Sequence, residues 1–264
     1  MSYSTQETQR GGRSAGEPLS PRTVQMIHAV LRNAIEHAVR EEVVPRNVVK
    51  LIRVPTPQYE VGTGLSVEQA RSVLAAVERD RFRALYVAAL VLGLRKGELL
   101  GLRWEDVDLA AGELHVRQAA QRVAGELRFS APKTRRSRRI VPLPELAADA
   151  LRERRARQAV DRLAAGPDWW DSGLVFTTAL GTPVEPRNLN RHWYGVRDRV
   201  GLSGVRFHDL RHTCVTLLLD AGVPPHIVQA IAGHSGIEVT MTIYAHAARE
   251  EQQAALRGLG ERLR

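Results

Sequence analysis

The residue types best suited to chemistry gather near the carboxyl end of the chain, between His208 and Tyr244. His208 and Arg211 are three positions apart, so a helix there places both side chains on one face. A Gly-Val-Pro-Pro stretch ends that helix, and a short helix over residues 225–232 brings His234 to its end. A guanidinium and two imidazoles bind anions and transfer protons, and the Tyr244 phenol is a candidate nucleophile.

Another basic residue, Arg95, stands where a glycine ends one helix and a new helix begins, in Gly93-Leu-Arg95-Lys-Gly-Glu98. Free backbone amides at a helix start favour an anion, and Arg95 is placed to share it. Glu98 is predicted to support Arg95 rather than to react.

A cationic turn separates two predicted strands further along the chain. It holds six basic residues and no acidic one, namely Arg128, Lys133, Arg135, Arg136, Arg138 and Arg139. Such a turn is either simply solvated or in contact with phosphate, and the charge of the whole chain favours phosphate. The five arginines are therefore predicted to bind DNA. Lys133 is a separate case because lysine, unlike arginine, can give up a proton.

The composition narrows the class of partner. A formal charge of +9 over 264 residues favours a polyanionic partner, and nucleic acid before a membrane surface. The alternative is a soluble basic protein without such a partner. Cys214 is the only cysteine, which excludes an internal disulfide framework and suits the cytoplasm. No apolar run reaches membrane-spanning length and no apolar signal segment opens the sequence, so neither a membrane partner nor secretion is expected.

The pattern of apolar residues predicts an α+β fold, mainly helical with a small antiparallel sheet. Residues 1–18 are predicted to be disordered, 19–56 to form helices too few to bury an apolar face alone, and 57–264 to form the main domain. Ser20 is expected to cap a helix that begins at Pro21, and Ser66 to Gln69 form a capping box at the start of another helix. Helices are expected over 66–78, 80–93, 144–165 and 189–200, with strands within 113–142 and at 174–176. An amphipathic helix over 250–264 either covers its own domain or docks on a neighbouring copy.

Several of these segments together resemble the phage integrase family of tyrosine recombinases. The resemblance is carried, in family order, by Gly93-Leu-Arg95-Lys-Gly-Glu98-Leu, Leu102-Arg-Trp104-Glu-Asp-Val-Asp108, Lys133 in a turn between strands, His208-Asp-Leu-Arg211-His212, Ala232-Gly-His234-Ser and Thr242-Ile-Tyr244-Ala-His246. Any one of these motifs is weakly specific, whereas six in order are specific.

The resemblance implies a role for each matched residue. Arg95 and Arg211 would clamp the scissile phosphodiester, and His208 and His234 would bond its non-bridging oxygens. His208 would also take the proton of Tyr244, which attacks phosphorus to give a 3′-phosphotyrosyl link. Lys133 would protonate the departing 5′ oxygen. His212 is expected to be structural, and His246 is left without a role.

The same resemblance implies partners and a domain order. It implies double-stranded DNA, homodimers that pair into a tetramer on DNA, accessory DNA-bending or directionality factors, and neither a metal nor another cofactor. The catalytic domain would cover 57–264, and 19–56 would be the remnant of a helical core-binding domain, from a short gene product or a start site inside a longer frame. DNA affinity is expected to be weak and salt-sensitive.

Three alternatives stay open at this point. The chain could be a catalytically idle DNA-binding remnant that competes with a full-length enzyme, or a relaxing topoisomerase of related chemistry. The third is a zinc site, because His208 and His212 are four apart on a helix and His234 could join them.

Overall fold

The computed structural model describes residues 18–55, 64–131, 138–234, 236–237 and 240–241. The chain divides into two compact units, Met1–Glu60 and Val61–Arg264. Within the described residues, no helix is both long and apolar enough to cross a membrane.

The smaller unit is built on one long helix, α1 (Pro21–Arg40). The Ser20 hydroxyl caps its first turn, and proline occupies the first helical position, as the sequence predicts. The short 3₁₀ helix η1 (Val48–Leu51) returns along it, with Nε2 of His28 lying 3.0 Å from the carbonyl oxygen of Val49.

This smaller unit leaves most of its apolar residues exposed. Among its described residues only Val49 is buried, whereas Met26, Ile27, Val30 and Leu31 on α1 are exposed. The unit does not bury an apolar face by itself, in agreement with the sequence prediction.

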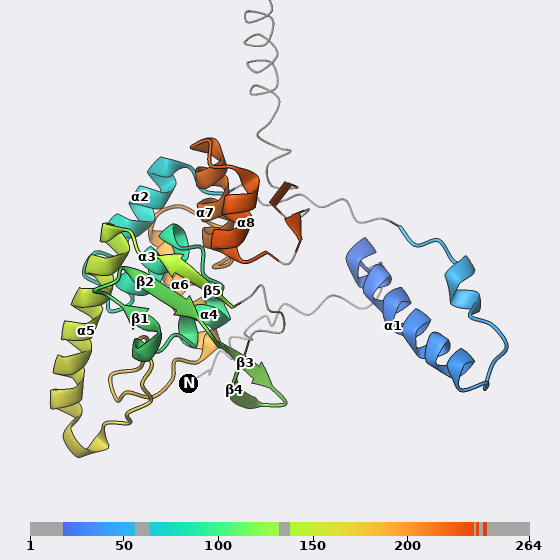
Figure 1. Ribbon diagram of the computed structural model, residues 1–264, viewed down its shortest axis with the longest axis horizontal. Coiled ribbons are helices and arrows are strands. Elements are labelled where there is room, and N and C mark those ends of the chain that lie inside the picture. The colour runs from blue at the N-terminus through green and yellow to red at the C-terminus, as the bar shows by residue number, and fades with distance from the viewer. Residues whose placement is uncertain (1–17, 56–63, 132–137, 235, 238–239, 242–264) are drawn as a thin grey trace, which may run out of the picture. The chain divides into compact units, whose positions relative to one another are not determined.

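Helices surround small sheets in the larger unit (Figure 1). They are α2 (Val67–Ala76), α3 (Arg83–Val91), α4 (Lys96–Leu100), α5 (Glu145–Ala165), α6 (Pro186–Arg199), α7 (Asp209–Asp220) and α8 (Pro225–Ala232), with the 3₁₀ turns η2 (Trp104–Asp106) and η4 (Gly166–Asp168). The capping box predicted at the start of α2 is present, and α8 has the predicted bounds.

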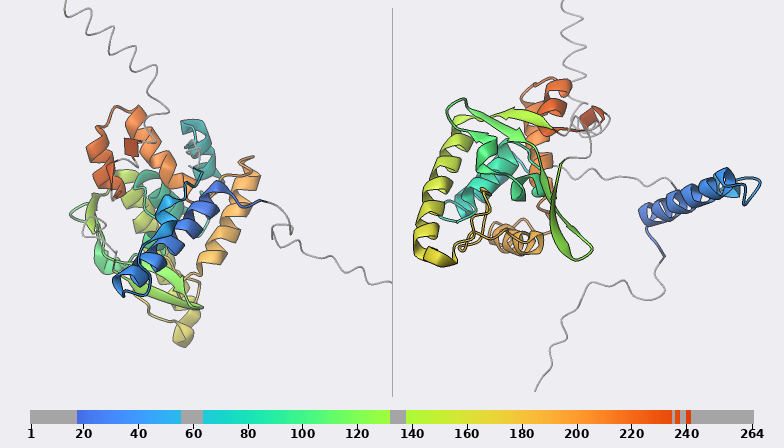
Figure 2. Two further views of the ribbon diagram at one scale, coloured as in Figure 1. Left: turned by 90° about the vertical axis from the view of Figure 1, so that its right-hand side faces the viewer. Right: turned by 60° about the horizontal axis from the view of Figure 1, so that its bottom comes forward.

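The strands form two antiparallel sheets rather than the single one expected. β1 (Val107–Asp108), β2 (Glu113–Val116) and β5 (Arg139–Pro142) pair in the order β1-β2-β5, and β3 (Ala119–Val123) pairs with β4 (Glu126–Ser130) in a separate two-stranded sheet. The hairpin turns at Ala124 and Gly125, both with positive φ, which matches the right-handed twist of its strands. Figure 2 shows this hairpin projecting from the body of the unit.

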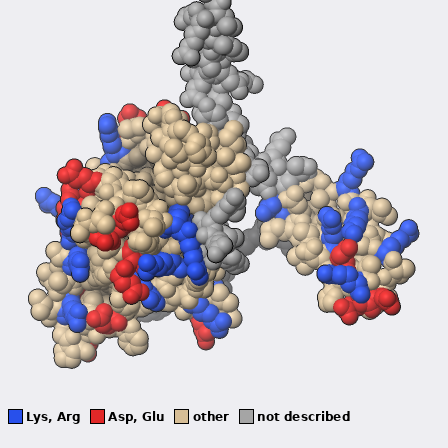
Figure 3. All heavy atoms as spheres, in the orientation of Figure 1, with Lys and Arg blue, Asp and Glu red and all other residues tan. Residues whose placement is uncertain are grey.

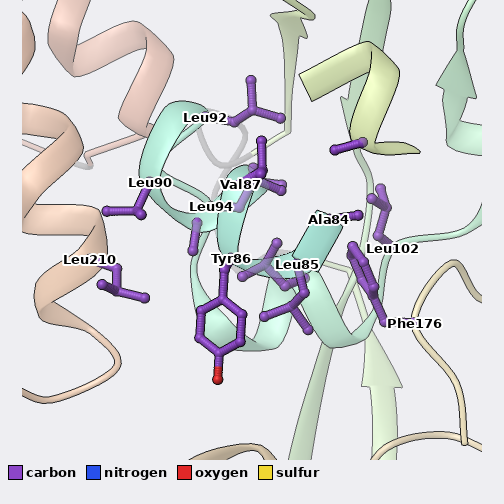
Figure 4. Close-up of a cluster of buried hydrophobic side chains, with 14 of the residues drawn as sticks. Ala84, Leu85, Tyr86, Val87, Leu90, Leu92, Leu94, Leu102, Phe176 and Leu210 are labelled. Carbon is purple, nitrogen blue, oxygen red and sulfur yellow. The ribbon is translucent and has the colours of Figure 1, made fainter. Parts of the chain in front are cut away.

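Helix α3 is the centre of the core. Seven of its residues are buried, Ala84 to Leu90, and side chains from distant segments pack around it, among them Leu102, Phe176 and Leu210 (Figure 4). A helix that is apolar on all sides belongs inside a domain. Because α3 packs on α7 and leads directly into α4, the core fixes the two elements that carry Arg211 and Arg95.

Two element predictions need correction. Residues 174–176 are buried but do not form a strand, because within the described part of the chain their ladder contact is limited to a single bridge from Leu174 to Arg103. Helix α6 starts at Pro186, three residues before the predicted start, since proline is tolerated in the first helical turn.

Candidate active site

Arg211 is a buried cation with one paired and one unpaired edge. Its side chain lies in the core-facing part of α7, and Nη1 donates a hydrogen bond to the carbonyl oxygen of Gly93 at 2.6 Å. Gly93 has φ +60°, where an added Cβ would lie 3.1 Å from Sγ of Cys214, so glycine suits this turn. Nη2 of Arg211 is buried without a hydrogen-bond partner among the described residues. An unpaired buried guanidinium edge fits an anionic ligand.

The surroundings of Arg211 strengthen this requirement for an anion. Burial, with the nearby guanidinium of Arg95 as the next cause, lowers the pKa of Arg211 to about 9. The side chain is still protonated at neutral pH, so two cations share the site there. A phosphodiester would offset both the burial and the repulsion.

Arg95 is held by a neighbouring carboxylate and by the end of a distant helix. Nη1 donates to Oε1 of Glu98 at 2.8 Å, and Nη2 donates to the carbonyl oxygen of Gly233 at 2.7 Å. The predicted support by Glu98 is confirmed. The backbone amide of Arg95 is bonded to Oε2 of Glu98 at 2.9 Å, so this amide is not offered to an anion as the sequence suggested. Binding of an anion by the guanidinium of Arg95 stays a prediction.

His234 is presented by the last turn of α8. Gly233 caps the helix in the left-handed conformation with φ 68°, and His234 follows it into a buried position. Nδ1 lies 2.8 Å from Oγ1 of Thr240. Burial first, and then the charges of Arg211 and Arg95, lower the pKa of His234 to about 3. The imidazole is neutral at physiological pH and can donate to a phosphate oxygen through Nε2 if Nδ1 accepts from Thr240.

This depressed pKa predicts acid sensitivity. Since the pKa of His234 falls from 6.5 in the unfolded chain to about 3 in the fold, the unfolded state binds more protons between these values. The free energy of unfolding should therefore decrease as pH falls through that window, by about 1.4 kcal/mol per pH unit from this group. Chemical denaturation between pH 4 and 6 should show that His234→Gln lowers the slope of the unfolding free energy against pH by about 1.4 kcal/mol per pH unit, which corresponds to about one proton.

A matched variant isolates this effect. His226, which lies on the same helix but is exposed, is replaced by glutamine in parallel. The unfolding free energy of His226→Gln should depend on pH as steeply as that of the parent chain. An unchanged slope in His234→Gln would contradict the electrostatic description of the site.

His208 lies at the N-cap of α7, beside Arg211 but at the surface. Its ring meets the ring of His212 edge-on with centroids 4.9 Å apart. Desolvation, then the charges of His212 and Arg211, lower the pKa of His208 below its ordinary value. Because the residue is exposed, solvent moderates the desolvation, and the positive charges of Arg211 and Arg206 also lower the pKa. His208 is thus a neutral base at neutral pH, next to the buried arginine.

Comparison with known proteins identifies the family. A model of the phage integrase family matches residues 64–251, which is most of the chain. The chain belongs to the phage integrase family. The resemblance carried by the six motifs is thereby confirmed.

Individual relatives and structures agree with this assignment. The chain is 33% identical over 260 residues to a "Tyrosine recombinase XerC-like" protein of Caldanaerobacter subterraneus subsp. tengcongensis, covering 92% of this chain and 66% of the relative. It is 34% identical over 248 residues to an integrase of Streptomyces ambofaciens, covering 91% and 64%. The chain therefore spans about two thirds of the length of these curated relatives.

The fold is also that of a solved integrase. The structure of the Tn1549 transposon integrase in complex with a circular intermediate DNA superposes with a TM-score of 0.76 at 25% identity, over 91% of this chain and 80% of that one. The predicted α+β class is confirmed by this match and by the observed elements.

In this integrase-family chain, the described arginines of the cationic turn differ in their exposure to solvent. Arg128 is exposed and its Nη2 lies 2.9 Å from Oε2 of Glu126, and Arg138 is exposed beside a hollow of about 460 Å³ that Arg117 also lines. Basic side chains gather over the strands of the larger unit in Figure 3. Exposed phosphate contacts by Arg128 and Arg138 stay predictions.

Arg139 does not occupy the exposed position expected of a DNA contact. Its side chain is only 6% exposed and forms an ion pair with Glu98, Nη2 to Oε2, at 3.0 Å. The two-residue period of β5 explains the difference, because Arg139 points to the same side as the buried Val141, whereas Ile140 points outward. The alternation of inward and outward residues along this strand could have predicted from the sequence that Arg139 faces inward.

The remaining predicted groups lie outside the described residues. They are Lys133, Arg135, Arg136 and Tyr244, together with His246 and the helix expected over 250–264. Of the six predicted catalytic residues, the structure therefore describes four. The charges of Arg95 and Arg211 both act on His234, and the charge of Arg211 also acts on His208, so these four residues lie near one another.

The zinc alternative finds no support in the described part of the chain, where no group of three histidine, cysteine, aspartate or glutamate residues is arranged to hold a metal ion. Sequence reasoning also missed Thr240 as the partner of His234. No local pattern marks that pair, since it depends on how the chain turns after α8.

Proposed function

We propose that the chain cuts and rejoins DNA strands at specific sites through a 3′-phosphotyrosyl intermediate. The observation that carries the proposal is the buried guanidinium of Arg211, whose Nη2 has no partner among the described residues while Arg95 and His234 are held beside it. The names of the relatives, a tyrosine recombinase and an integrase, and the DNA in the Tn1549 complex support double-stranded DNA as the substrate.

The proposed reaction exchanges one phosphodiester for another. The hydroxyl oxygen of Tyr244 bonds to phosphorus and the bond from phosphorus to the 5′ oxygen breaks, which leaves a 3′-phosphotyrosine and a free 5′ hydroxyl. Arg95 and Arg211 stabilise the charge that develops on the non-bridging oxygens, and His234 donates to one of them. A 5′ hydroxyl from a second strand reverses the step. Because an ester replaces an ester, no ATP is consumed.

Proton transfer is the reason the site needs a neutral base. An ordinary phenol with a pKa of about 10 is ionised to about one part in a thousand at neutral pH, a deficit of about 4 kcal/mol. His208, whose pKa lies below 6.5, is unprotonated at neutral pH and can accept the phenolic proton. The fixed cations supply the rest of the stabilisation.

The departing 5′ oxygen needs a proton donor, and Lys133 is proposed for this role because arginine does not release its proton. Lys133→Ala should slow single-turnover cleavage by about 10²-fold. A substrate with a 5′-bridging sulfur should restore most of the rate, since a thiolate leaves without protonation. Equal slowing on the oxygen and sulfur substrates would contradict the assignment, and Lys50→Ala, in the smaller unit, is the control.

The experiment that tests the function uses a trapped substrate. DNA bound by the full chain is first selected from a random pool, and the selected site is then built as a duplex with a nick next to the cleavage point. Cleavage releases a short 5′-hydroxyl fragment that diffuses away, so the covalent complex accumulates. Denaturing electrophoresis should show protein and labelled DNA in one band.

The outcome separates this proposal from its alternatives. Binding without a covalent band would indicate an idle DNA-binding protein. If the chain relaxes plasmid DNA and forms covalent adducts with it whatever the DNA sequence, it would be a topoisomerase. A band that disappears in chelator would revive the zinc hypothesis.

Assembly on DNA is part of the same proposal. Exchange between two duplexes requires cleavage of several strands, which favours dimers that pair into a tetramer. Accessory bending or directionality factors stay predictions, as does the assignment of residues 19–56 to a core-binding domain.

A further inference from the structure

Arg139 joins three segments of the larger unit. Its Nε donates to the carbonyl oxygen of Ile231 at 2.8 Å, near the end of α8. Its Nη1 and Nη2 donate to Oε1 and Oε2 of Glu98, at 3.1 and 3.0 Å. Both partners of this ion pair are almost completely buried, with 6% and 4% of the side chains exposed. A two-pronged, charge-assisted contact of this kind fixes position as well as adding energy.

The same carboxylate also holds Arg95. Oε1 of Glu98 accepts from Nη1 of Arg95 at 2.8 Å, and Nη2 of Arg95 reaches the carbonyl oxygen of Gly233 at 2.7 Å. Two guanidinium groups bridged by one carboxylate therefore bind two carbonyls of the α8 terminus, those of Ile231 and Gly233. The next residue in the chain is His234.

The conformation of Gly233 completes the arrangement. Its φ of +68° turns the chain at the helix end, and a Cβ added there would lie 2.7 Å from Nη1 and 2.9 Å from Cζ of Arg139. The guanidinium thus occupies the space that a side chain at this position would need. The helix end and Arg139 fit each other only with glycine present.

We propose that Arg139 is a positioning residue for strand cleavage: through Glu98 and the last turn of α8, it holds the Arg95 guanidinium and the His234 imidazole in one geometry. The inference rests on the proposed function. It replaces a phosphate contact by Arg139 with an internal role, because a side chain enclosed by Glu98 and Ile231 does not face DNA.

A conservative substitution tests the proposal. Arg139→Lys keeps the charge but cannot span both oxygens of Glu98 and the Ile231 carbonyl together. At saturating DNA the single-turnover cleavage rate should fall about 10- to 100-fold, because misplacement of catalytic groups by about 1 Å has an effect of this size. The dissociation constant for DNA should change less than about twofold, since no phosphate contact is lost.

The chain offers a matched control at another buried arginine. Nε of Arg154, on α5, donates to the carbonyl oxygen of Val175 at 2.9 Å, and its Nη1 lies 3.5 Å from Oδ2 of Asp161. Arg154→Lys makes the same chemical change at a buried arginine, paired with the partly exposed Asp161, outside the candidate site. At a temperature where both variants are folded, its cleavage rate should stay within about twofold of the parent.

A second measurement needs no activity. Hydrogen exchange of the backbone amides around Gly233 and His234 should accelerate in Arg139→Lys and not in Arg154→Lys. Equal cleavage rates in the two variants, or unchanged exchange at the α8 terminus, would overturn the positioning role. A higher Kd for DNA with an unchanged cleavage rate in Arg139→Lys would overturn it in favour of a DNA contact. If the parent chain forms no covalent adduct although exchange responds as expected, the proposed function fails, and with it any role of this network in cleavage.

Discussion

Tyr244→Phe is expected to abolish the covalent protein–DNA adduct while leaving DNA binding within about twofold of the parent chain. The phenylalanine ring keeps the size and shape of the side chain but has no oxygen to bond to phosphorus. No other group in the proposed mechanism attacks phosphorus, so the loss should be complete rather than partial. Adduct formation is measured with the nicked duplex, and binding is measured in parallel by gel shift.

The control for this variant is an exposed tyrosine in the described part of the chain. Tyr194 lies on α6, where the guanidinium of Arg197 stacks over its ring at 4.5 Å from the centroid. Tyr194→Phe keeps this stacking and should form the adduct at the rate of the parent chain. An adduct that persists in Tyr244→Phe would place the nucleophile elsewhere.

Arg211→Gln should lower the single-turnover cleavage rate by about 10³-fold at saturating DNA. Loss of a single donor to a developing oxyanion typically slows a reaction by about 10²- to 10³-fold, and here a full charge is lost with the donors. The upper end of the range is expected because Arg211 is buried and its Nη2 has no other partner among the described residues.

Stability should respond much less than activity. The substitution removes the hydrogen bond to Gly93 but also a buried cation whose pKa is lowered to about 9 by its surroundings. These effects oppose each other, so the free energy of unfolding should change by less than about 2 kcal/mol. Thermal unfolding of Arg211→Gln beside Arg154→Gln checks this. A large loss of stability in Arg211→Gln alone would mean that the arginine serves the fold rather than the reaction.

Local chemistry made much of this fold predictable. The Ser66 capping box, the proline at the start of α1 and the Gly-Val-Pro-Pro break before α8 all appear as expected. Each depends on residues a few positions apart, where backbone geometry leaves few alternatives. The support of Arg95 by Glu98 was predictable for the same reason, since the two lie three residues apart.

Contacts between distant segments were not predictable in this way. The bond from Arg95 to Gly233 joins residues 138 positions apart, and the bond from Arg139 to Ile231 joins residues 92 apart. The charge of Arg139 groups it with the cationic turn, although the alternation in β5 places it beside Val141 on the buried side. A neighbouring carboxylate makes that burial acceptable, and only the folded arrangement brings Glu98 there.

The measurement that tests the central claim most directly is the mass of the DNA-linked peptide. The adduct formed on the nicked duplex is digested with nuclease and protease, and the peptide that carries the residual nucleotide is fragmented. The nucleotide should be joined through its 3′ phosphate to Tyr244. A phosphate on any other residue, or DNA that is cleaved with no residue modified, would contradict the proposed mechanism.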